Sequence, residues 1–215
     1  MNRAFIWFVK ITGFIPYVFY YRLKKYYVNK PKKRKDARIL ISNHTSVMDF
    51  PVYFYVYSNK IVRPLAAELL YEKNKFLKFM LKNIGAIKVN RDTFDFNFIE
   101  ESINALNKGH DVLIFPESRI PTKKELLEFK PSFVEIAIEA NVPIIPMYTN
   151  GSYKNKKRAK VMIGEEVDLT KLYDDKKTKK ENIEYLTNYV RNIIIDLGER
   201  LYATEQKQEK DSTNM

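Results

Sequence analysis

Short apolar runs alternate with longer segments of helical periodicity along most of the chain. This alternation is typical of a sheet whose two faces are covered by helices, and apolar strand runs favour parallel pairing. We predict strands over residues 37–42, 61–67, 84–90, 111–115, 143–148 and 159–163, and helices over 46–57, 69–83, 93–107 and 132–140. The pattern therefore predicts an α/β fold, a single-domain sandwich with a mainly parallel or mixed central sheet.

The last predicted helix follows a capping box, Thr178-x-x-Glu181, and a similar box at 132–135 precedes an earlier helix. The residues after Tyr202 are polar, and we expect them to fray. We therefore assign residues 36–203 to the folded domain and residues 204–215 to a polar tail. The apolar positions that define the last helix recur at helical spacing: Ile183, Leu186, Val190, Ile193, Ile194, Leu197 and Leu201.

Residues 1–35 differ from the rest of the chain because they are both aromatic and basic. Lys10, Gly13 and Pro16 interrupt the apolar stretch and argue against a straight helix buried in lipid. Aromatic residues followed by a lysine run are typical of a helix, or helical pair, that lies in the interface of an anionic membrane. The alternative is an ordinary helix over the core with a solvated basic linker; we favour the membrane-interface segment.

Net charge changes this picture only at the N-terminus. The chain carries a formal charge of +12, and residues 1–35 hold seven lysines, three arginines and no acidic residue. The remaining residues are nearly balanced, which argues against a nucleic-acid groove. The charge concentrated in residues 1–35 favours an anionic membrane surface as partner. There is no cysteine and there are two histidines, so we expect no disulfide, no metal site and no bound cofactor.

Polar clusters follow three of the predicted strands. One strand is followed by Asn43 and His44, another by Arg91, and a third by Glu117. Because reactive groups gather where the strands of such a fold end, we expect these side chains to share one edge of the sheet.

His44 and Asp49 are five positions apart in the stretch ISNHTSVMDF. On a continuous helix their side chains would point about 140° apart, so they meet only if the chain turns between them. Asp49 also fits a helix start, as the acid of a capping box that begins at Ser46 or as an N-cap followed by Pro51. Either placement allows the carboxylate to fix the imidazole tautomer and leave the other ring nitrogen as a base. His110 is expected to be a turn residue that leads into a strand.

Four motifs occur in a characteristic order: NHTSVMD, GAIKVNR, FPESR and VPIIPMY. In this order and spacing the chain resembles the glycerophospholipid acyltransferase family, and within it the short bacterial lysophosphatidate acyltransferases. The resemblance covers residues 37–148, and the basic aromatic N-terminus looks like the membrane-docking helices of that family.

The resemblance implies a role for each matching position. His44 matches the general base of the family, Asp49 its orienting acid, and Arg91 an arginine implicated in binding the acceptor's phosphate. The other matching positions, which support these motifs or the acceptor site, are Asn43, Gly85, Phe115, Pro116, Glu117, Val142 and Pro143.

The chain departs from the family's third motif, which usually runs Phe-Pro-Glu-Gly-Thr-Arg. Ser118 stands in place of the glycine, and Arg119 comes one position early. We expect an acceptor site formed by Arg91, Glu117, Ser118 and Arg119, with phosphate contact assigned to Arg91; Arg119 fits a solvated surface charge equally well.

The implied reaction is acyl transfer from acyl-CoA or acyl carrier protein to the hydroxyl of a lysophospholipid, on the cytoplasmic face of a membrane. There is neither a Gly-x-Ser-x-Gly motif nor a cysteine, so direct attack without an acyl-enzyme is expected. Two alternatives stay open from the sequence: a transferase or thioesterase with a non-phosphate acceptor, and a non-catalytic basic module that binds membranes or nucleic acid.

Overall fold

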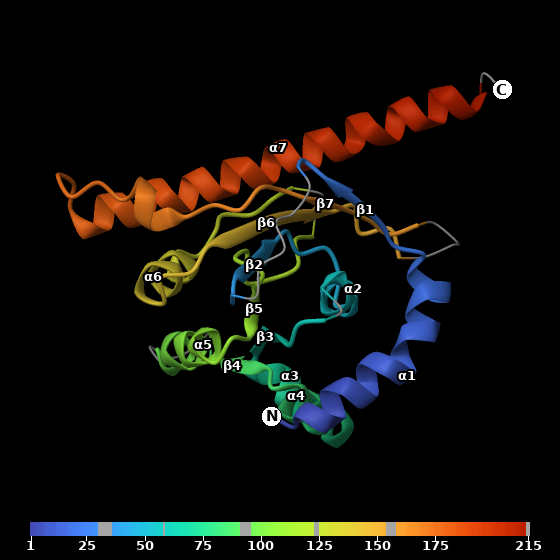
Figure 1. The fold of residues 1–215 in the computed structure, drawn as a ribbon, viewed down its shortest axis with the longest axis horizontal. Helices are drawn as coiled ribbons and strands as arrows, with labels where there is room; N and C mark the ends of the chain where they lie inside the picture. Colours follow the sequence, from blue (N-terminus) through green and yellow to red (C-terminus); the bar gives the residue numbers. More distant parts are fainter. Residues whose placement is uncertain (30–35, 58, 91–95, 123–124, 154–157, 214–215) are drawn as a thin grey trace.

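The computed structural model describes residues 1–29, 36–57, 59–90, 96–122, 125–153 and 158–213. The strands within these ranges form a seven-stranded sheet (Figure 1). Five neighbouring strands run parallel, β7 runs antiparallel to β6, and β1 is parallel to β7. The order across the sheet is β1 (Lys24–Tyr27), β7 (Lys160–Ile163), β6 (Ile144–Thr149), β2 (Ile39–Ser42), β5 (Asp111–Ile114), β3 (Val62–Ala67) and β4 (Ile87–Val89). The predicted α/β sandwich with a mainly parallel or mixed sheet is confirmed.

The central strands are buried on both faces, as their continuous apolar sequences predict. Every residue of β2 and of β5 is buried. In β2, Leu40 faces one core, whereas its neighbours Ile39 and Ile41 face the other. Leu40 pairs with Leu113 on one side and with Ile145 on the other, so the middle of the sheet is the most deeply buried part of the fold.

Helices cover both faces of this sheet (Figure 1). On one face α1 and α2 pack against it, and on the other α5, α6 and α7 do so. The bounds are α1 (Arg3–Tyr21), α2 (Asp49–Val56), α3 (Glu68–Lys73), α4 (Lys75–Ile84), α5 (Asn97–Asn107), α6 (Ser132–Glu139), the short 3₁₀ helix η1 (Leu169–Leu172) and α7 (Lys179–Thr213).

Three local predictions need correction. The helix predicted over 69–83 is two helices, because Asn74 is extended and its side chain caps α4 by accepting the Leu77 N–H at 2.7 Å. The capping box predicted at 132–135 is absent, since Pro131 holds the N-cap position without a side-chain hydrogen bond. The tail expected to fray after Tyr202 is helical, because α7 continues to Thr213.

The capping box at Thr178 is confirmed. The Thr178 N–H donates to the Glu181 carboxylate at 2.8 Å, and the Glu181 N–H donates to the Thr178 hydroxyl at 3.3 Å. This reciprocal pair fixes the start of α7, the longest helix in Figure 1.

The N-terminal segment is part of this architecture. α1 is one helix with Pro16 inside it, and β1 adds an edge strand to the sheet, so the sheet begins before residue 36. A Cβ at Gly13 would lie 2.4 Å from the Tyr55 hydroxyl oxygen; glycine therefore allows α1 to lie close against α2. Among the described residues, no helix combines the length and the apolar composition that a membrane span requires.

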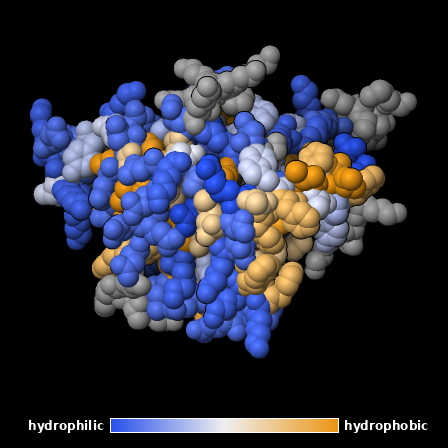
Figure 2. All heavy atoms as spheres, turned by 60° about the horizontal axis from the view of Figure 1, so that its bottom comes forward, coloured by the Kyte–Doolittle hydropathy of each residue, from blue (hydrophilic) through white to orange (hydrophobic). Residues whose placement is uncertain are grey.

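One face of α1 is buried and the other is exposed and apolar. Ile6, Lys10 and Tyr17 face the domain. Figure 2 shows apolar residues gathered on the side of the molecule where α1 lies. We call the outward set the α1 apolar face: Trp7, Phe8, Ile11, Phe14, Ile15, Val18 and Phe19.

Candidate active site

The structure brings His44 and Asp49 into direct contact. His44 lies just after β2 and Asp49 is the first residue of α2, with the turn that the sequence required between them. The imidazole Nδ1 and the carboxylate Oδ2 are 2.7 Å apart. Asp49 is fully buried, whereas 17% of the His44 side chain is exposed. The carboxylate is therefore shielded from water while the ring remains accessible.

Asp49 is held by several donors besides the imidazole. The N–H groups of Thr45 and Ser46 donate to Oδ2 at 2.6 and 2.9 Å, and the Thr45 hydroxyl donates to Oδ1 at 2.8 Å. The Tyr153 hydroxyl also donates to Oδ1. Such charge-assisted hydrogen bonds orient a carboxylate strongly. Sequence reasoning did not include Thr45 or Tyr153 in the site.

Neither predicted helix-cap placement of Asp49 is right. Met48 holds the N-cap position, without a side-chain cap bond, and Asp49 is the first helical residue. Because the carboxylate folds back, it still accepts the Ser46 N–H, which lies three positions earlier. Pro51 lies in the first turn, where its missing donor is harmless. Asp49 thus closes the turn and contacts His44 at the same time.

The contact with Asp49 defines the tautomer of His44. A carboxylate can only accept, so Nδ1 carries the proton and Nε2 of the neutral ring has a free lone pair. Within the described ranges, the ring makes its one hydrogen bond through Nδ1. The imidazole stacks on Phe115, with ring centroids 4.3 Å apart and planes at 15°. Asp49 and Phe115 therefore fix the imidazole of His44 and leave its Nε2 open.

Glu117 connects the ends of β2 and β5. It is almost fully buried. Its Oε1 accepts the backbone N–H of His44 at 2.7 Å, and its Oε2 accepts the Leu127 N–H at 2.9 Å. Burial raises the pKa of Glu117, and the Leu127 and His44 N–H groups oppose that rise. His44 and Glu117 share one edge of the sheet, as predicted from the strand ends.

Asn43 joins β2 to the end of β6. Its amide oxygen accepts the Thr149 N–H at 2.8 Å, and its amide nitrogen donates to the Thr149 carbonyl at 3.0 Å. The buried Ser42 and Tyr53 hydroxyls are also hydrogen-bonded to each other. These contacts fix the backbone on both sides of the strand that leads into His44.

Tyr153 reaches Asp49 from the loop after β6. Gly151 in that loop has φ +64°, and a Cβ there would lie 2.7 Å from the Thr45 hydroxyl oxygen, so only glycine allows this close packing. Burial and the Asp49 charge raise the pKa of Tyr153, so its hydroxyl stays a donor. No local pattern marks this residue among fifteen tyrosines.

The predicted acceptor residues are only partly described. Arg91 lies outside the described residues. Gly85 has φ +77° and ends α4, where the Met1 side chain occupies the space of a Cβ. Ser118 has φ +60°, a left-handed conformation that glycine adopts more readily than other residues, and it stands where the motif that the sequence resembles has glycine. Arg119 is exposed and forms no ion pair or hydrogen bond with another described residue.

The remaining motif positions lie either beside Glu117, at the edge of the sheet that carries His44, or at the start of β6. Phe115 and Pro116 connect β5 to Glu117, and the Pro116 carbonyl accepts the Lys130 N–H at 2.9 Å. Val142 and Pro143 precede β6, and the Pro143 carbonyl accepts the Ile39 N–H at 3.0 Å. His110 comes directly before β5, as predicted.

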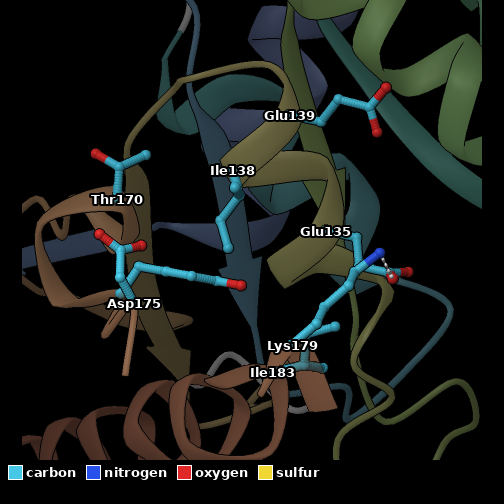
Figure 3. A pocket seen from close by; sticks show the side chains of 8 residues that line it. Glu135, Ile138, Glu139, Thr170, Asp175, Lys179 and Ile183 are labelled. Atoms are coloured by element: carbon cyan, nitrogen blue, oxygen red, sulfur yellow. Dashed lines mark ion pairs between the residues drawn. The ribbon is translucent and has the colours of Figure 1, made fainter. Parts of the chain in front are cut away.

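A separate hollow of about 520 Å³ lies between α6, η1 and the start of α7 (Figure 3). Glu135 and Lys179 form an ion pair of 3.4 Å across it. None of the predicted site residues lines this hollow. In the part of the chain that the structure describes, no three His, Asp or Glu side chains are placed to hold a metal ion.

Comparison with known proteins finds two relatives named 1-acyl-sn-glycerol-3-phosphate acyltransferase and one named Taffazin. A 1-acyl-sn-glycerol-3-phosphate acyltransferase of Cocos nucifera is 24% identical over 156 residues, covering 72% of this chain and 51% of that protein. The human 1-acyl-sn-glycerol-3-phosphate acyltransferase beta is 27% identical over 158 residues, covering 71% and 55%. A Dictyostelium discoideum protein named Taffazin is 30% identical over 152 residues, covering 63% and 53%. The chain spans about half the length of these relatives.

The fold also has a counterpart among solved structures. The crystal structure of the 1-acyl-sn-glycerophosphate (LPA) acyltransferase PlsC from Thermotoga maritima aligns with a TM-score of 0.68 and 21% identity, covering 92% of this chain and 80% of that one. At this identity the likeness shows a shared fold. The family model named Acyltransferase matches residues 25–150, which is more than half of the chain and includes His44, Asp49 and Glu117. The chain belongs to the acyltransferase family.

Proposed function

We propose that this protein transfers a fatty acyl group from a thioester, of acyl-CoA or acyl carrier protein, to the free hydroxyl of a lysophosphatidate-like glycerolipid. The observation that carries the proposal is the His44–Asp49 pair, with a buried carboxylate on Nδ1 and an open Nε2. The names of the relatives support the same substrate class.

In the first step, Nε2 of His44 removes the proton of the acceptor hydroxyl as its oxygen attacks the thioester carbonyl. The ring becomes an imidazolium, which the buried Asp49 carboxylate stabilises through Nδ1–H. The product of this step is a tetrahedral intermediate with one C–O bond formed and the C–S bond still intact.

In the second step the intermediate collapses. The C–S bond breaks, the carbonyl reforms as an ester, and the thiolate leaves. The proton on Nε2 neutralises the thiolate, so His44 returns to its starting state. No covalent acyl-enzyme is needed, because the acceptor hydroxyl is itself the nucleophile.

We assign the acceptor's phosphate to Arg91, with Ser118 and Arg119 as further contacts. A guanidinium offers a fixed fork of donors that matches a phosphate. Arg119 is exposed and its charge is available, and the Ser118 hydroxyl offers one more donor. Glu117 is assigned a different task, the organisation of the backbone around His44, because both of its oxygens accept backbone N–H groups.

We place the protein on the cytoplasmic face of an anionic membrane, in contact through the α1 apolar face. That face is exposed, and the basic residues of 1–35 lie on the same segment. Apolar side chains inserted at the interface and basic groups near anionic headgroups contribute additively to such binding. This location brings the lipid acceptor within reach of a protein that takes its donor from water.

The experiment is an assay of thiol release from acyl-CoA and from acyl carrier protein. The acceptors are lysophosphatidate, glycerol 3-phosphate, lysophosphatidylglycerol and uncharged monoacylglycerol, beside a reaction without acceptor. We expect release that depends on a phosphate-bearing acceptor, and a loss of kcat/KM for that acceptor in Arg91→Ala without a matching change in donor KM. Equal release without acceptor would identify a thioesterase instead.

Two substitutions test the dyad in the same assay. We expect His44→Ala to lose at least about 10²-fold in kcat, the usual minimum for a general base. Asp49→Asn is expected to be severely impaired, because an amide facing Nδ1 disfavours the required tautomer. The matched control is His110→Ala, which changes the other histidine of the chain and should keep its rate. A folded His44→Ala protein with normal turnover would refute the mechanism.

A further inference from the structure

Arg191 of α7 holds a loop that lies next to the candidate active site. Its guanidinium donates through Nη2 to the Leu126 carbonyl at 3.0 Å and through Nε to the Leu127 carbonyl at 3.2 Å. Two successive carbonyls thus share one planar fork of donors, an arrangement that lysine cannot reproduce. Val190 and Ile194, on the same turn of α7 as Arg191, are fully buried in the core. The backbone from which the Arg191 side chain extends is therefore held in place.

The loop held by Arg191 in turn holds Glu117. The Leu127 N–H donates to Oε2 of Glu117 at 2.9 Å, and the other oxygen accepts the His44 N–H at 2.7 Å. The carboxylate is buried, so water does not replace a donor that moves away. Loss of either N–H leaves a buried charged oxygen unsatisfied, which is more costly than loss of an exposed contact.

From these contacts we propose that Arg191 is a positioning residue for His44, acting through the 126–127 backbone and the Glu117 carboxylate. The inference rests on the proposed function, because it assigns a role towards the same base. It concerns a residue that lies 147 positions after His44 and outside the four sequence motifs.

Loss of the two Arg191 hydrogen bonds is expected to shift the His44 imidazole without weakening the binding of either substrate. If the fork is broken, residues 126–127 move relative to α7, Glu117 turns to follow its donor, and the His44 backbone loses a charged acceptor. The imidazole stays bonded to Asp49 and stacked on Phe115, so the ring remains present but is displaced. Misplacement by about 1 Å can cost about 10²-fold in rate without any change in the reacting groups.

The kinetic test compares Arg191→Lys with Arg200→Lys. Arg200 is exposed on the same helix and pairs with Asp196 at 2.7 Å, so it controls for a change of arginine to lysine on α7. We expect Arg191→Lys to lower kcat by about tenfold or more, within the range that small displacements produce, with the KM of donor and acceptor unchanged. Arg191→Gln, which keeps an amide donor for one carbonyl, provides a second variant should the lysine variant not fold.

The path from Arg191 through residues 126–127 and Glu117 to His44 is tested by combining substitutions. Glu117→Gln interrupts the path between Leu127 and His44. In that background Arg191→Lys should change kcat by less than about twofold, because substitutions within one hydrogen-bond network are not additive. If the two losses multiply, Arg191 acts by another route and the proposal is wrong.

A measurement without substrate separates this proposal from the proposed function. The chain has two histidines, so ¹⁵N-histidine labelling gives two backbone amide signals. We expect the His44 signal to move upfield in Arg191→Lys, as its bond to a carboxylate weakens. The His110 signal should stay in place, because its N–H donates to the Ala105 carbonyl at 3.1 Å, away from Arg191.

The outcomes are distinct. An unchanged His44 amide in a folded Arg191→Lys protein overturns the inference, whatever the enzyme's activity. A lower melting temperature with normal kcat also overturns it, since Arg191 would then stabilise the fold alone. A shifted His44 amide in a protein that transfers no acyl group supports the positioning role and rejects the proposed function.

Discussion

At the scale of single residues, the Asp49 carboxylate has two roles that are usually separate. It closes the turn after β2 by accepting the Thr45 and Ser46 N–H groups, and it fixes the imidazole of His44. Asp49 can therefore begin the helix and hold His44 at the same time, because the carboxylate that folds back over the turn also contacts Nδ1. A buried carboxylate with this many donors has little freedom to rotate, so the direction of Nε2 is fixed as well.

We predict that Tyr153→Phe lowers both turnover and stability. The change removes a donor to Oδ1 of Asp49 while keeping the aromatic ring. Loss of a hydrogen bond to a buried charge is expected to lower the free energy of unfolding by about 1–3 kcal/mol, and a freer carboxylate should reduce kcat severalfold. Urea unfolding and steady-state kinetics measure the two effects.

The control for this prediction is Tyr26→Phe, which removes a hydroxyl bonded to Gln208 at the far edge strand. It should leave kcat unchanged. A Tyr153→Phe protein that is less stable but fully active would show that the hydroxyl only fills a structural role.

The candidate site was predictable from the sequence where its residues follow strands. His44 and Glu117 come directly after two apolar runs, and parallel strands bring such positions to one edge. Tyr153 and Arg191 were not predictable in this way. Tyr153 follows its strand by four positions, beyond a glycine turn whose geometry the sequence does not give. Arg191 lies on the polar side of an amphipathic helix, where an arginine that binds carbonyls and a solvated one have the same pattern.

At the scale of elements, α2 is fixed at both ends. Asp49 lies at its N-terminus, and two lysines bind carbonyls at and just beyond its C-terminus. Lys25 of β1 donates to the Val56 carbonyl at 2.6 Å, and Lys10 of α1 donates to the Lys60 carbonyl at 2.6 Å and the Tyr57 carbonyl at 3.3 Å. Cations at a helix C-terminus are favourable. The N-terminal segment thus positions the helix that carries Asp49.

We predict that Lys10→Met changes how stability depends on pH. Burial lowers the pKa of Lys10 from 10.5 to about 8, so between these values the unfolded chain binds more protons than the native one. Stability of the wild type should therefore rise through this window relative to Lys10→Met, by up to about 1.4 kcal/mol per pH unit. Urea unfolding from pH 7 to 10 measures the difference.

Below pH 8 the lysine is charged in both states, and the two stability curves should run parallel there. Parallel curves across the whole range would contradict the lowered pKa. The tyrosines whose pKa is raised by burial, such as Tyr57 at about 12, destabilise the native state only above pH 10. Measurements up to pH 10 therefore isolate the lysine.

The predictions of helices and strands are confirmed where a segment is long or strongly apolar. They fail where a short polar strand pairs with a partner that is far away in the sequence. The strands predicted from apolar runs are all present within a few residues. β1 was missed because its four residues are half lysine, and its partner β7 lies more than 130 positions away. Backbone pairing with β7, rather than local propensity, makes this half-exposed segment a strand.

At the scale of the whole molecule, the α1 apolar face has neighbours on other elements. Phe76 of α4 and Leu69 of α3 are also exposed. α1 is attached to this part of the fold, because the Asn2 N–H donates to the Asn83 carbonyl at 2.9 Å and Phe5 packs edge-on against Phe79 at 5.5 Å. Exposed apolar residues on three helices, of which α4 contacts both of the others, are typical of an interaction surface.

This attachment decides how the membrane proposal must be tested. Removal of residues 1–35 would delete β1 and uncover the core that Ile6 and Tyr17 help to form. A truncated protein would then lose membrane binding simply because it unfolds. Substitutions on the outward face avoid this problem, because Ile11 and Ile15 are 71% and 65% exposed.

We predict that Ile11→Glu combined with Ile15→Glu releases the folded protein from anionic vesicles. Insertion of each isoleucine should contribute about 1.5–3 kcal/mol of transfer free energy, and the new carboxylates are repelled by anionic lipid, so the bound fraction should fall at least tenfold. Free energy of unfolding should change by no more than about 0.5 kcal/mol per exposed site. The matched control, Tyr185→Glu with Asn188→Glu on exposed positions of α7, adds the same charge elsewhere and should keep the protein on the vesicles. If the Ile11 and Ile15 variant is folded and sediments with vesicles as the wild type does, α1 is not the membrane contact.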